Sequence, residues 1–250
     1  MITPGGEIAF VSKLITESSD PATRTKIQWF SSMLGKLSSV NAIVEALRVA
    51  QCDNYSVAEF IQGQKTKRWC VAWSWLGYRP SVGVARSIPA LEKRLLPFPS
   101  AFEFEIVADG ASVDDVGEKV DGEIAKLDVM QWRWKAALAT GVGVSSNGDC
   151  WSRKARRRKE QGKADEEMRD ANEVSSDDDD DDDVEEEKEA RLAFKVQVAS
   201  KRTDVNLNVE KKSTAAVVVV HVRWLQGHEA VLFESFCGWL KRRVENACMN

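Results

Sequence analysis

An acidic stretch at residues 160–190 limits most strongly how this chain can fold. It holds 17 Asp and Glu residues against three basic ones, and seven consecutive aspartates form Asp177–Asp183. Like charges at this density repel one another, and the stretch has almost no apolar area to bury, so it cannot join a packed core. We therefore expect a disordered acidic insertion inside a folded domain. The stretch carries a charge of −14 and the whole chain −4, so the remainder carries +10, which suits a polyanionic partner such as RNA.

The rest of the composition is that of a folded protein. Hydrophobic residues make up 43% of the 250 residues, enough for one large or two small domains. No apolar run reaches the roughly 20 residues that span a bilayer, and we expect no secretory signal. Five scattered cysteines without a Cys-x-x-Cys pair predict reduced thiols and no zinc site. These features favour a nuclear or cytoplasmic protein, or one found in both places, that does not bind membranes.

Residues 1–76 show an alternating pattern of helices and strands. Apolar residues at helical spacing predict helices at 5–17 and near 39–47, and short apolar runs predict strands at 27–34, 55–61 and 68–75. We expect the first strand to be buried and Ser38 or Ser39 to cap the second helix. This order of elements is typical of the end of a doubly wound α/β sheet with an antiparallel edge. The segment 1–76 is too short to form a complete sheet of that kind.

A second domain is predicted after a proline-rich linker at 77–101. Alternating or helically spaced apolar residues predict strands and helices at 102–106, 116–127, 130–144, 192–198, 215–224 and 231–244. These elements indicate an α+β domain made of residues 102–159 and 191–250. Its Gly141-Val142-Gly143 does not open a helix, so we interpret it as a turn and not as a nucleotide-binding loop.

Two basic segments are candidates for RNA binding. The loop Gln62–Arg68 combines a turn-forming glycine with three cations that could dock phosphates, although a solvated hairpin turn explains the same residues. The tryptophans that alternate along the following strand indicate core packing more than base stacking. The cluster Arg153–Lys159 could bind phosphates, serve in nuclear import, or pair with Asp177–Asp183. The two histidines are isolated, which argues against a metal site or a catalytic pair.

Four blocks of the chain resemble consecutive motifs of one enzyme family. They are Gly5-Gly6-Glu7-Ile8-Ala9-Phe10-Val11, Trp29-Phe30-Ser31-Ser32-Met33-Leu34-Gly35-Lys36, Gln62-Gly63-Gln64-Lys65, and Arg68-Trp69 followed by Ala72-Trp73-Ser74. Their order and spacing over about 75 residues resemble the RlmF and U6 small nuclear RNA adenine N6-methyltransferase family. The resemblance implies the C-terminal half of a Rossmann-like class I methyltransferase sheet. It also implies a transfer of methyl from S-adenosylmethionine to adenine N6 in a structured small nuclear or ribosomal RNA.

The resemblance implies roles for some residues and leaves others without a counterpart. Gly5, Gly6 and Glu7 match the entrance to the helix after the catalytic loop, and the basic hairpin matches one that lies near the RNA in the family. Together with the second cluster, which is a candidate through its charge and not through the resemblance, the candidate RNA-binding residues are Gln62, Gly63, Lys65, Lys67, Arg68, Arg153, Lys154, Arg156, Arg157 and Arg158. At the hairpin, lysine keeps the charge of the family's arginine but loses its bidentate fork, which favours contacts to the RNA backbone.

Two family motifs do not occur in the 250 residues. They are the Gly-rich turn that holds S-adenosylmethionine and the Asn-Pro-Pro-Phe signature that holds the target adenine, so no catalytic residue is assigned. We therefore expect a truncated gene model, a shortened isoform or a degenerate copy that is inactive alone. The alternative is a non-catalytic RNA-binding remnant. The second domain resembles, more weakly, the C-terminal RNA-binding module of the eukaryotic enzymes.

Overall fold

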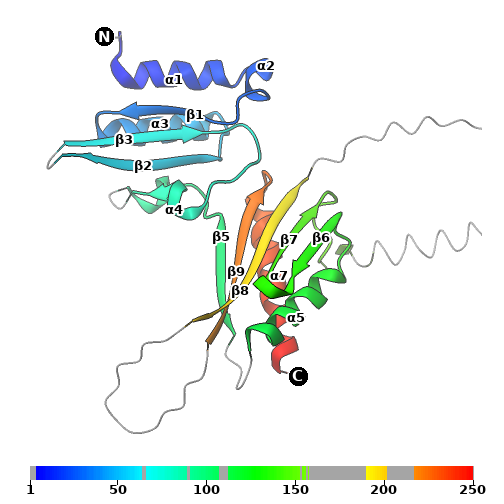
Figure 1. The fold of residues 1–250 in the computed structure, drawn as a ribbon. Coiled ribbons are helices and arrows are strands. Elements are labelled where there is room, and N and C mark those ends of the chain that lie inside the picture. Colours follow the sequence, from blue (N-terminus) through cyan, green and yellow to red (C-terminus); the bar gives the residue numbers. More distant parts are fainter. Residues whose placement is uncertain are drawn as a thin grey trace, which may run out of the picture. The chain divides into compact units, whose positions relative to one another are not determined.

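The computed structural model describes residues 4–63, 66–88, 91–106, 112–152, 154, 155, 157, 190–201 and 217–249 (Figure 1). The acidic stretch, predicted to be disordered, lies outside the described residues except for its last residue. The chain forms two compact units. The first is Met1–Phe102 with Val222–Ala230, and the second is Glu103–His221 with Val231–Asn250. Among the described helices, none is both long and apolar enough to cross a membrane.

The first unit is built around a four-stranded sheet in the order β1-β3-β2-β4. Its elements are α1 (Gly6–Ser18), α2 (Pro21–Arg24), β1 (Phe30–Leu34), α3 (Leu37–Val49), β2 (Tyr55–Gln62), β3 (Thr66–Trp73), α4 (Val82–Ala85), β4 (Arg86–Ser87) and the 3₁₀ helix η1 (Lys93–Leu95). Since β3 pairs antiparallel with both β1 and β2, these two strands are parallel to each other and α3 connects them. The predicted α/β class is confirmed, and the antiparallel strand lies inside this sheet and not at its edge.

The core of the first unit lies between the sheet and the helices α1 and α3. The apolar stripe of α3, which includes Ile43 and Leu47, is fully buried, as its spacing predicts. Trp73 of β3 is also fully buried, and its Nε1 donates a hydrogen bond of 3.0 Å to Ser18 Oγ at the end of α1. Trp75 Nε1 donates to the same oxygen at 2.9 Å. The prediction that the tryptophans of this strand serve core packing is therefore confirmed for Trp73.

Three expectations for the first unit are wrong in detail. The strand predicted as buried is β1, which lies at the edge of the described sheet, so its residues alternate in exposure and Met33 is 57% exposed. Helix α3 begins at Leu37 after Lys36, without a side-chain cap from either serine. The segment 77–101, expected as a linker, contains α4, β4 and η1, and it contributes Ile88 and Leu91 to the core.

The second unit holds most of a five-stranded sheet in the order β5-β9-β8-β7-β6. Its elements are β5 (Ala101–Ile106), α5 (Val113–Ala125), β6 (Gln131–Lys135), the 3₁₀ helix η2 (Ala136–Leu138), β7 (Thr140–Ser145), β8 (Leu192–Lys201), β9 (Val217–Gln226) and α7 (Ala230–Met249). A capping box formed by Ser112 and Asp115 begins α5. The succession of strands and helices agrees with the predicted α+β pattern.

The Gly-x-Gly sequence of the second unit belongs to a strand, so its interpretation as a turn is wrong. Gly141 and Gly143 lie in β7, and a Cβ atom on Gly141 would come within 2.7 Å of Cε3 of Trp134 and even closer to the ring of Trp132. A Cβ atom on Gly143 would overlap the ring of Phe194 in the same way. Because the two glycines have no side chains, they leave room for aromatic rings on the helix-covered face of the sheet.

Candidate nucleic-acid interface

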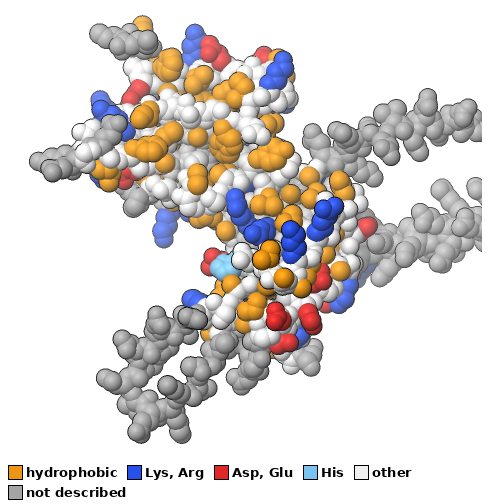
Figure 2. Space-filling view, in the orientation of Figure 1, with side chains coloured by type: hydrophobic (Ala, Val, Ile, Leu, Met, Phe, Trp, Pro, Cys, Tyr) orange, Lys and Arg blue, Asp and Glu red, His pale blue; other side chains and the backbone are white. Residues whose placement is uncertain are grey.

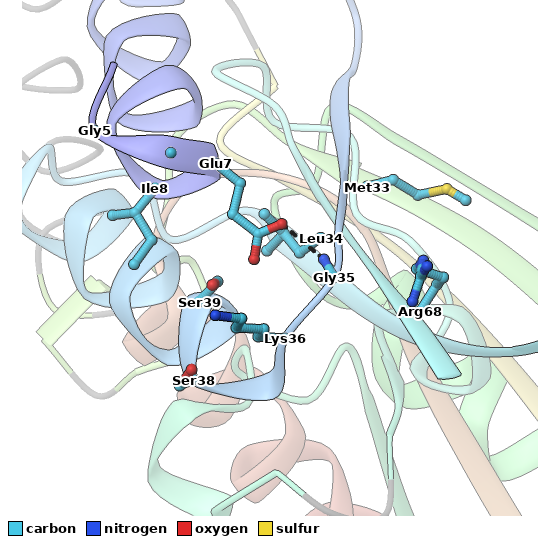
Figure 3. Close-up of a pocket in the computed structure, with 11 residues that line it drawn as sticks. Gly5, Glu7, Ile8, Met33, Leu34, Gly35, Lys36, Ser38, Ser39 and Arg68 are labelled. Carbon is cyan, nitrogen blue, oxygen red and sulfur yellow. Dashed lines mark hydrogen bonds between the residues drawn. The ribbon is translucent and has the colours of Figure 1, made fainter. Parts of the chain in front are cut away.

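A hollow of about 780 Å³ opens in the first unit where the start of α1, the end of β1 and the start of α3 come together (Figure 3). Its lining combines glycines, hydroxyl groups, one carboxylate and two cations. The lining residues are Gly5, Gly6, Glu7, Ile8, Met33, Leu34, Gly35, Lys36, Ser38, Ser39 and Arg68. All of them except Ser38 and Ser39 come from three of the four sequence blocks that resemble the methyltransferase motifs.

Two glycines shape the wall of the hollow at the start of α1. Gly5 and Gly6 have φ angles of 78° and 69°, a left-handed conformation that other residues rarely adopt. A side chain on Gly5 would also place its Cβ atom 2.6 Å from Cβ of Ala9. This tight entry places Glu7 in the first turn of α1, with its carboxylate directed toward the segment after β1 (Figure 3).

Glu7 joins the two sides of the hollow. Its Oε2 accepts a hydrogen bond of 2.8 Å from the backbone N–H of Gly35, a residue 28 positions away in the sequence. Burial tends to raise the pKa of this carboxyl. Hydrogen bonds from Ser39 and from the amides of Gly35 and Lys36, together with the Lys36 charge, outweigh burial and hold the pKa below its ordinary value. The ionised Glu7 thus fixes the Gly35-Lys36 turn against α1.

The electrostatics of the hollow favour an anion. The N-terminal ends of α1 and α3 both border it, and the aligned peptide dipoles give each end a partial positive charge. Lys36 and Arg68 add two full positive charges at its rim. Glu7 offsets part of this charge, but its Oε2 is already engaged with Gly35. A phosphate group would match the two rim cations in charge.

The two described cations of the basic hairpin point in different directions. Gly63, with a φ angle of 65°, makes the turn between β2 and β3. Lys67 Nζ lies 2.7 Å from Oε1 of Glu59 on the neighbouring strand. Its neighbour Arg68 points to the opposite face of β3, where it lines the hollow. Lys65 and the side chain of Gln62 lie outside the described residues.

The second predicted cluster is described only in part. Lys154 and Arg157 are exposed, whereas Arg153, Arg156 and Arg158 lie outside the described residues. Sequence reasoning did not single out Lys36 or Ser39 as binding residues. The available signal was Gly35-Lys36, a glycine and a cation placed directly between a strand and a helix, which is a common arrangement at anion sites.

Comparison with known proteins links the first unit to one family. Residues 1–77 match a family model described as RNA methyltransferase. One relative that is similar over nearly the whole chain is the U6 small nuclear RNA (adenine-(43)-N(6))-methyltransferase of Schizosaccharomyces pombe, which is 27% identical over 98% of this chain and 52% of its own length. The chain thus spans about half the length of this curated relative.

Two solved structures also match, over about 30% of the chain. One is the hMettl16 catalytic domain in complex with MAT2A 3′UTR hairpin 1, with 36% identity, a TM-score of 0.28, and coverage of 30% of this chain and 25% of that one. The other is the N-terminal domain of human METTL16 in complex with SAH, with 36% identity, a TM-score of 0.26, and coverage of 30% and 28%.

Proposed function

Because residues 1–77 match a family model described as RNA methyltransferase, we propose that the protein transfers a methyl group from S-adenosylmethionine to N6 of an adenine in structured RNA. In this proposal the hollow of the first unit receives phosphates of that RNA. The fission yeast relative is named as a methyltransferase of adenine N6 in U6 small nuclear RNA, which supports the proposed reaction. One matching structure is titled as a complex with an RNA hairpin, which supports binding of structured RNA. A small nuclear RNA substrate would place the reaction in the nucleus.

One observation carries the proposal. Three family-like blocks that are far apart in the sequence supply most of the lining of a single hollow, and the 2.8 Å hydrogen bond from Gly35 to Glu7 joins two of them. The cations Lys36 and Arg68 come from two different blocks and border the same space. Arg and Lys side chains are among the groups with which proteins contact the phosphates of nucleic acids.

The described residues do not fit S-adenosylmethionine. The Gly-x-Gly of the second unit opens no helix, and the rings of Trp132 and Phe194 fill the space in front of it. The hollow of the first unit has Lys36 and Arg68 at its rim, and these cations suit a phosphate better than a sulfonium cation. We therefore assign neither the cofactor nor the transfer step to residues of this chain. Its residues bind and orient the RNA, with Lys36 and Arg68 on phosphates and Glu7 fixing the turn that carries Lys36.

The proposed activity is tested by identifying the methylated nucleoside that forms. The protein that contains these 250 residues is incubated with S-adenosylmethionine and a hairpin RNA with one unpaired adenine, and the RNA nucleosides are separated by mass spectrometry. We expect N6-methyladenosine, and none when the unpaired adenine is replaced. Methylation at another position, or no methylation of a hairpin that the fission yeast relative modifies in parallel, would overturn the proposal.

A pair of matched variants tests whether the hollow binds RNA. Lys36→Gln with Arg68→Gln removes two charges from its rim, and Arg24→Gln with Lys26→Gln removes two exposed charges elsewhere in the same unit. We expect the rim variant to lower hairpin affinity roughly tenfold and to reduce the slope of log K against log salt by about 1.5, since each phosphate contact contributes about 0.7–0.9. Equal affinities and slopes for the two variants would exclude the hollow from RNA binding.

A further inference from the structure

The sheet of the second unit has one face covered by helices and one open face. On the covered face Phe194 of β8 packs on Phe236 of α7 with ring centroids 4.1 Å apart, and a Cβ atom on Gly117 of α5 would lie 3.0 Å from Trp134. Side chains that point the other way from β6 and β7 are exposed or half-buried, and Val142 is 41% exposed. We call this side of β6, β7 and β8 the open face.

Three cations lie close together on the open face. Arg133 of β6 pairs with Val142 of β7, and Val142 pairs with Lys195 of β8, so these side chains form a row across the sheet. Lys135 lies two residues beyond Arg133 on the same face. Given the ordinary spacing of strands, the backbones of Arg133 and Lys195 are about 10 Å apart. Figure 2 shows Lys and Arg side chains gathered over this part of the second unit.

These three cations have no carboxylate partner among the described residues. No ion pair in the described part of the chain includes Arg133, Lys135 or Lys195. The acids of β5, at the other edge of the sheet, are engaged elsewhere, since Glu105 lies 2.6 Å from Lys201 and Glu103 lies 3.0 Å from His221. Because like charges repel at such short range, the open face favours an anion that spans it.

The acidic stretch of this same chain is attached to the sheet beside the open face. Strands β7 and β8 pair at Ser145 and Leu192, and the chain between them contains residues 160–190, of which only Ala190 is described. Lys195 lies about 10 Å from Leu192 along β8. The nine residues from Asp183 to Leu192 can span up to about 30 Å. The aspartate run Asp177–Asp183 is therefore within reach of the open face.

Charge and connection both make the aspartate run a suitable anion for this face. Its seven carboxylates follow one another without interruption, and the three cations of the face lie in two neighbouring rows. A group joined to its partner by so short a connection is present there at an effective concentration on the order of millimolar. Single exposed ion pairs are weak, but several formed by one segment support one another.

The basic cluster Arg153–Lys159 is the other group of cations near the acidic stretch. Along the chain, 18 residues separate Lys159 from Asp177, whereas 12 residues separate Asp183 from Lys195. Closing the smaller loop loses less conformational entropy, which favours the open face. The experiment below distinguishes these two groups of cations.

We propose that the aspartate run Asp177–Asp183 binds the open face of β6–β8 in the same molecule and supplies the counterions of Arg133, Lys135 and Lys195. The contact is an intramolecular brake, because a face that is occupied by the chain's own carboxylates is closed to polyanions from outside. It is electrostatic and therefore weakens as the salt concentration rises. The inference does not rest on the proposed function, since both partners belong to this chain.

The test is zero-length cross-linking of the full chain. A carbodiimide joins a lysine amine to a carboxylate only where the two are in contact, and mass spectrometry of the peptides identifies each joined pair. The reaction is run in about 0.1 M and about 1 M KCl, where the Debye length is about 10 Å and about 3 Å. Lys119 and Lys126, at α5 on the covered side of the sheet, are the reference amines. A matched variant changes the seven aspartates to asparagine and keeps the length of the chain.

We expect Lys135 and Lys195 to be joined to the aspartate run more often than the reference amines at the lower salt concentration, and roughly fivefold less often at the higher one. In the asparagine variant, whose fold circular dichroism verifies, acetic anhydride should acetylate Lys135 and Lys195 roughly two- to fivefold faster than in the wild type, the range expected for an exposed ion pair.

Three results would overturn the inference. Products confined to Lys154 and Lys159 would assign the aspartates to the basic cluster. Products that disappear on dilution would assign them to a second copy of the chain. Equal cross-linking of the open-face and reference amines, with unchanged acetylation in the asparagine variant, would show that the aspartates do not bind the face. Methyl transfer tests the proposed function separately from all three.

Discussion

Replacing Gly141 with alanine should destabilise the second unit. The new Cβ atom would overlap the ring of Trp132, and this ring is held in place because its Nε1 donates a 2.7 Å hydrogen bond to Asp121 and its face stacks on Phe194. A crowded site with such fixed neighbours typically costs about 1–3 kcal/mol. For a chain of this size, that corresponds to a fall in melting temperature of roughly 2–4 °C per kcal/mol.

The matched control for this prediction is Gly122→Ala. Gly122 lies in α5 of the same unit, and a Cβ atom there meets no other atom within 4 Å, so alanine should stabilise the helix by up to about 1 kcal/mol. Urea titration measures both free energies of unfolding, and hydrogen exchange in β7 assigns the change to the second unit. If Gly141→Ala is as stable as Gly122→Ala, then the absence of a side chain at Gly141 is not what makes room for the Trp132 ring.

Three further predictions concern the first unit and the acidic stretch. Ser18→Ala should lower the free energy of unfolding by about 1–3 kcal/mol, because it leaves the buried N–H of Trp73 without its acceptor, and urea titration measures this loss. Glu7→Gln should lower stability at pH 7. Since the folded pKa of Glu7 is below its ordinary value, the gap to the wild type should close as the pH falls below about 4, and a constant gap in titrations at pH 7 and pH 3.5 would contradict this. Deleting residues 160–190 should tighten hairpin binding in anisotropy measurements, because the acids compete with RNA for the same cations.

The spacing of apolar residues predicted helices and strands well where a segment had a clear helical or alternating period. Val40, Ile43, Val44 and Leu47 repeat at helical spacing, and all four are fully buried in α3. The pattern was less informative for β1, because an apolar run does not reveal whether a strand has a neighbour on both sides. Similarly, four prolines between 77 and 101 suggested a linker, although Leu91 and Leu95 of that segment are buried.

The candidate site could be predicted only in part, because its main contact is not local. Gly5, Gly6 and Glu7 were singled out through a motif, but nothing in the sequence indicates that Glu7 accepts a hydrogen bond from Gly35. In the same way, adjacent Lys67 and Arg68 look like one basic cluster. Strand geometry separates them, and Glu59 then pairs with Lys67, so that Arg68 is left to line the hollow.

The overall charge of the protein is a poor guide to what an RNA molecule meets at its surface. A net charge of −4 suggests repulsion, yet the acids are concentrated in residues 160–190 and the rest of the chain carries +10. At physiological salt the Debye length is about 8 Å, so phosphates respond to the charges within that distance and not to the total. The rim of the hollow, with Lys36 and Arg68, is locally positive by this measure. For this reason the salt slope of the rim variant, and not the isoelectric point, measures how many phosphates the hollow contacts.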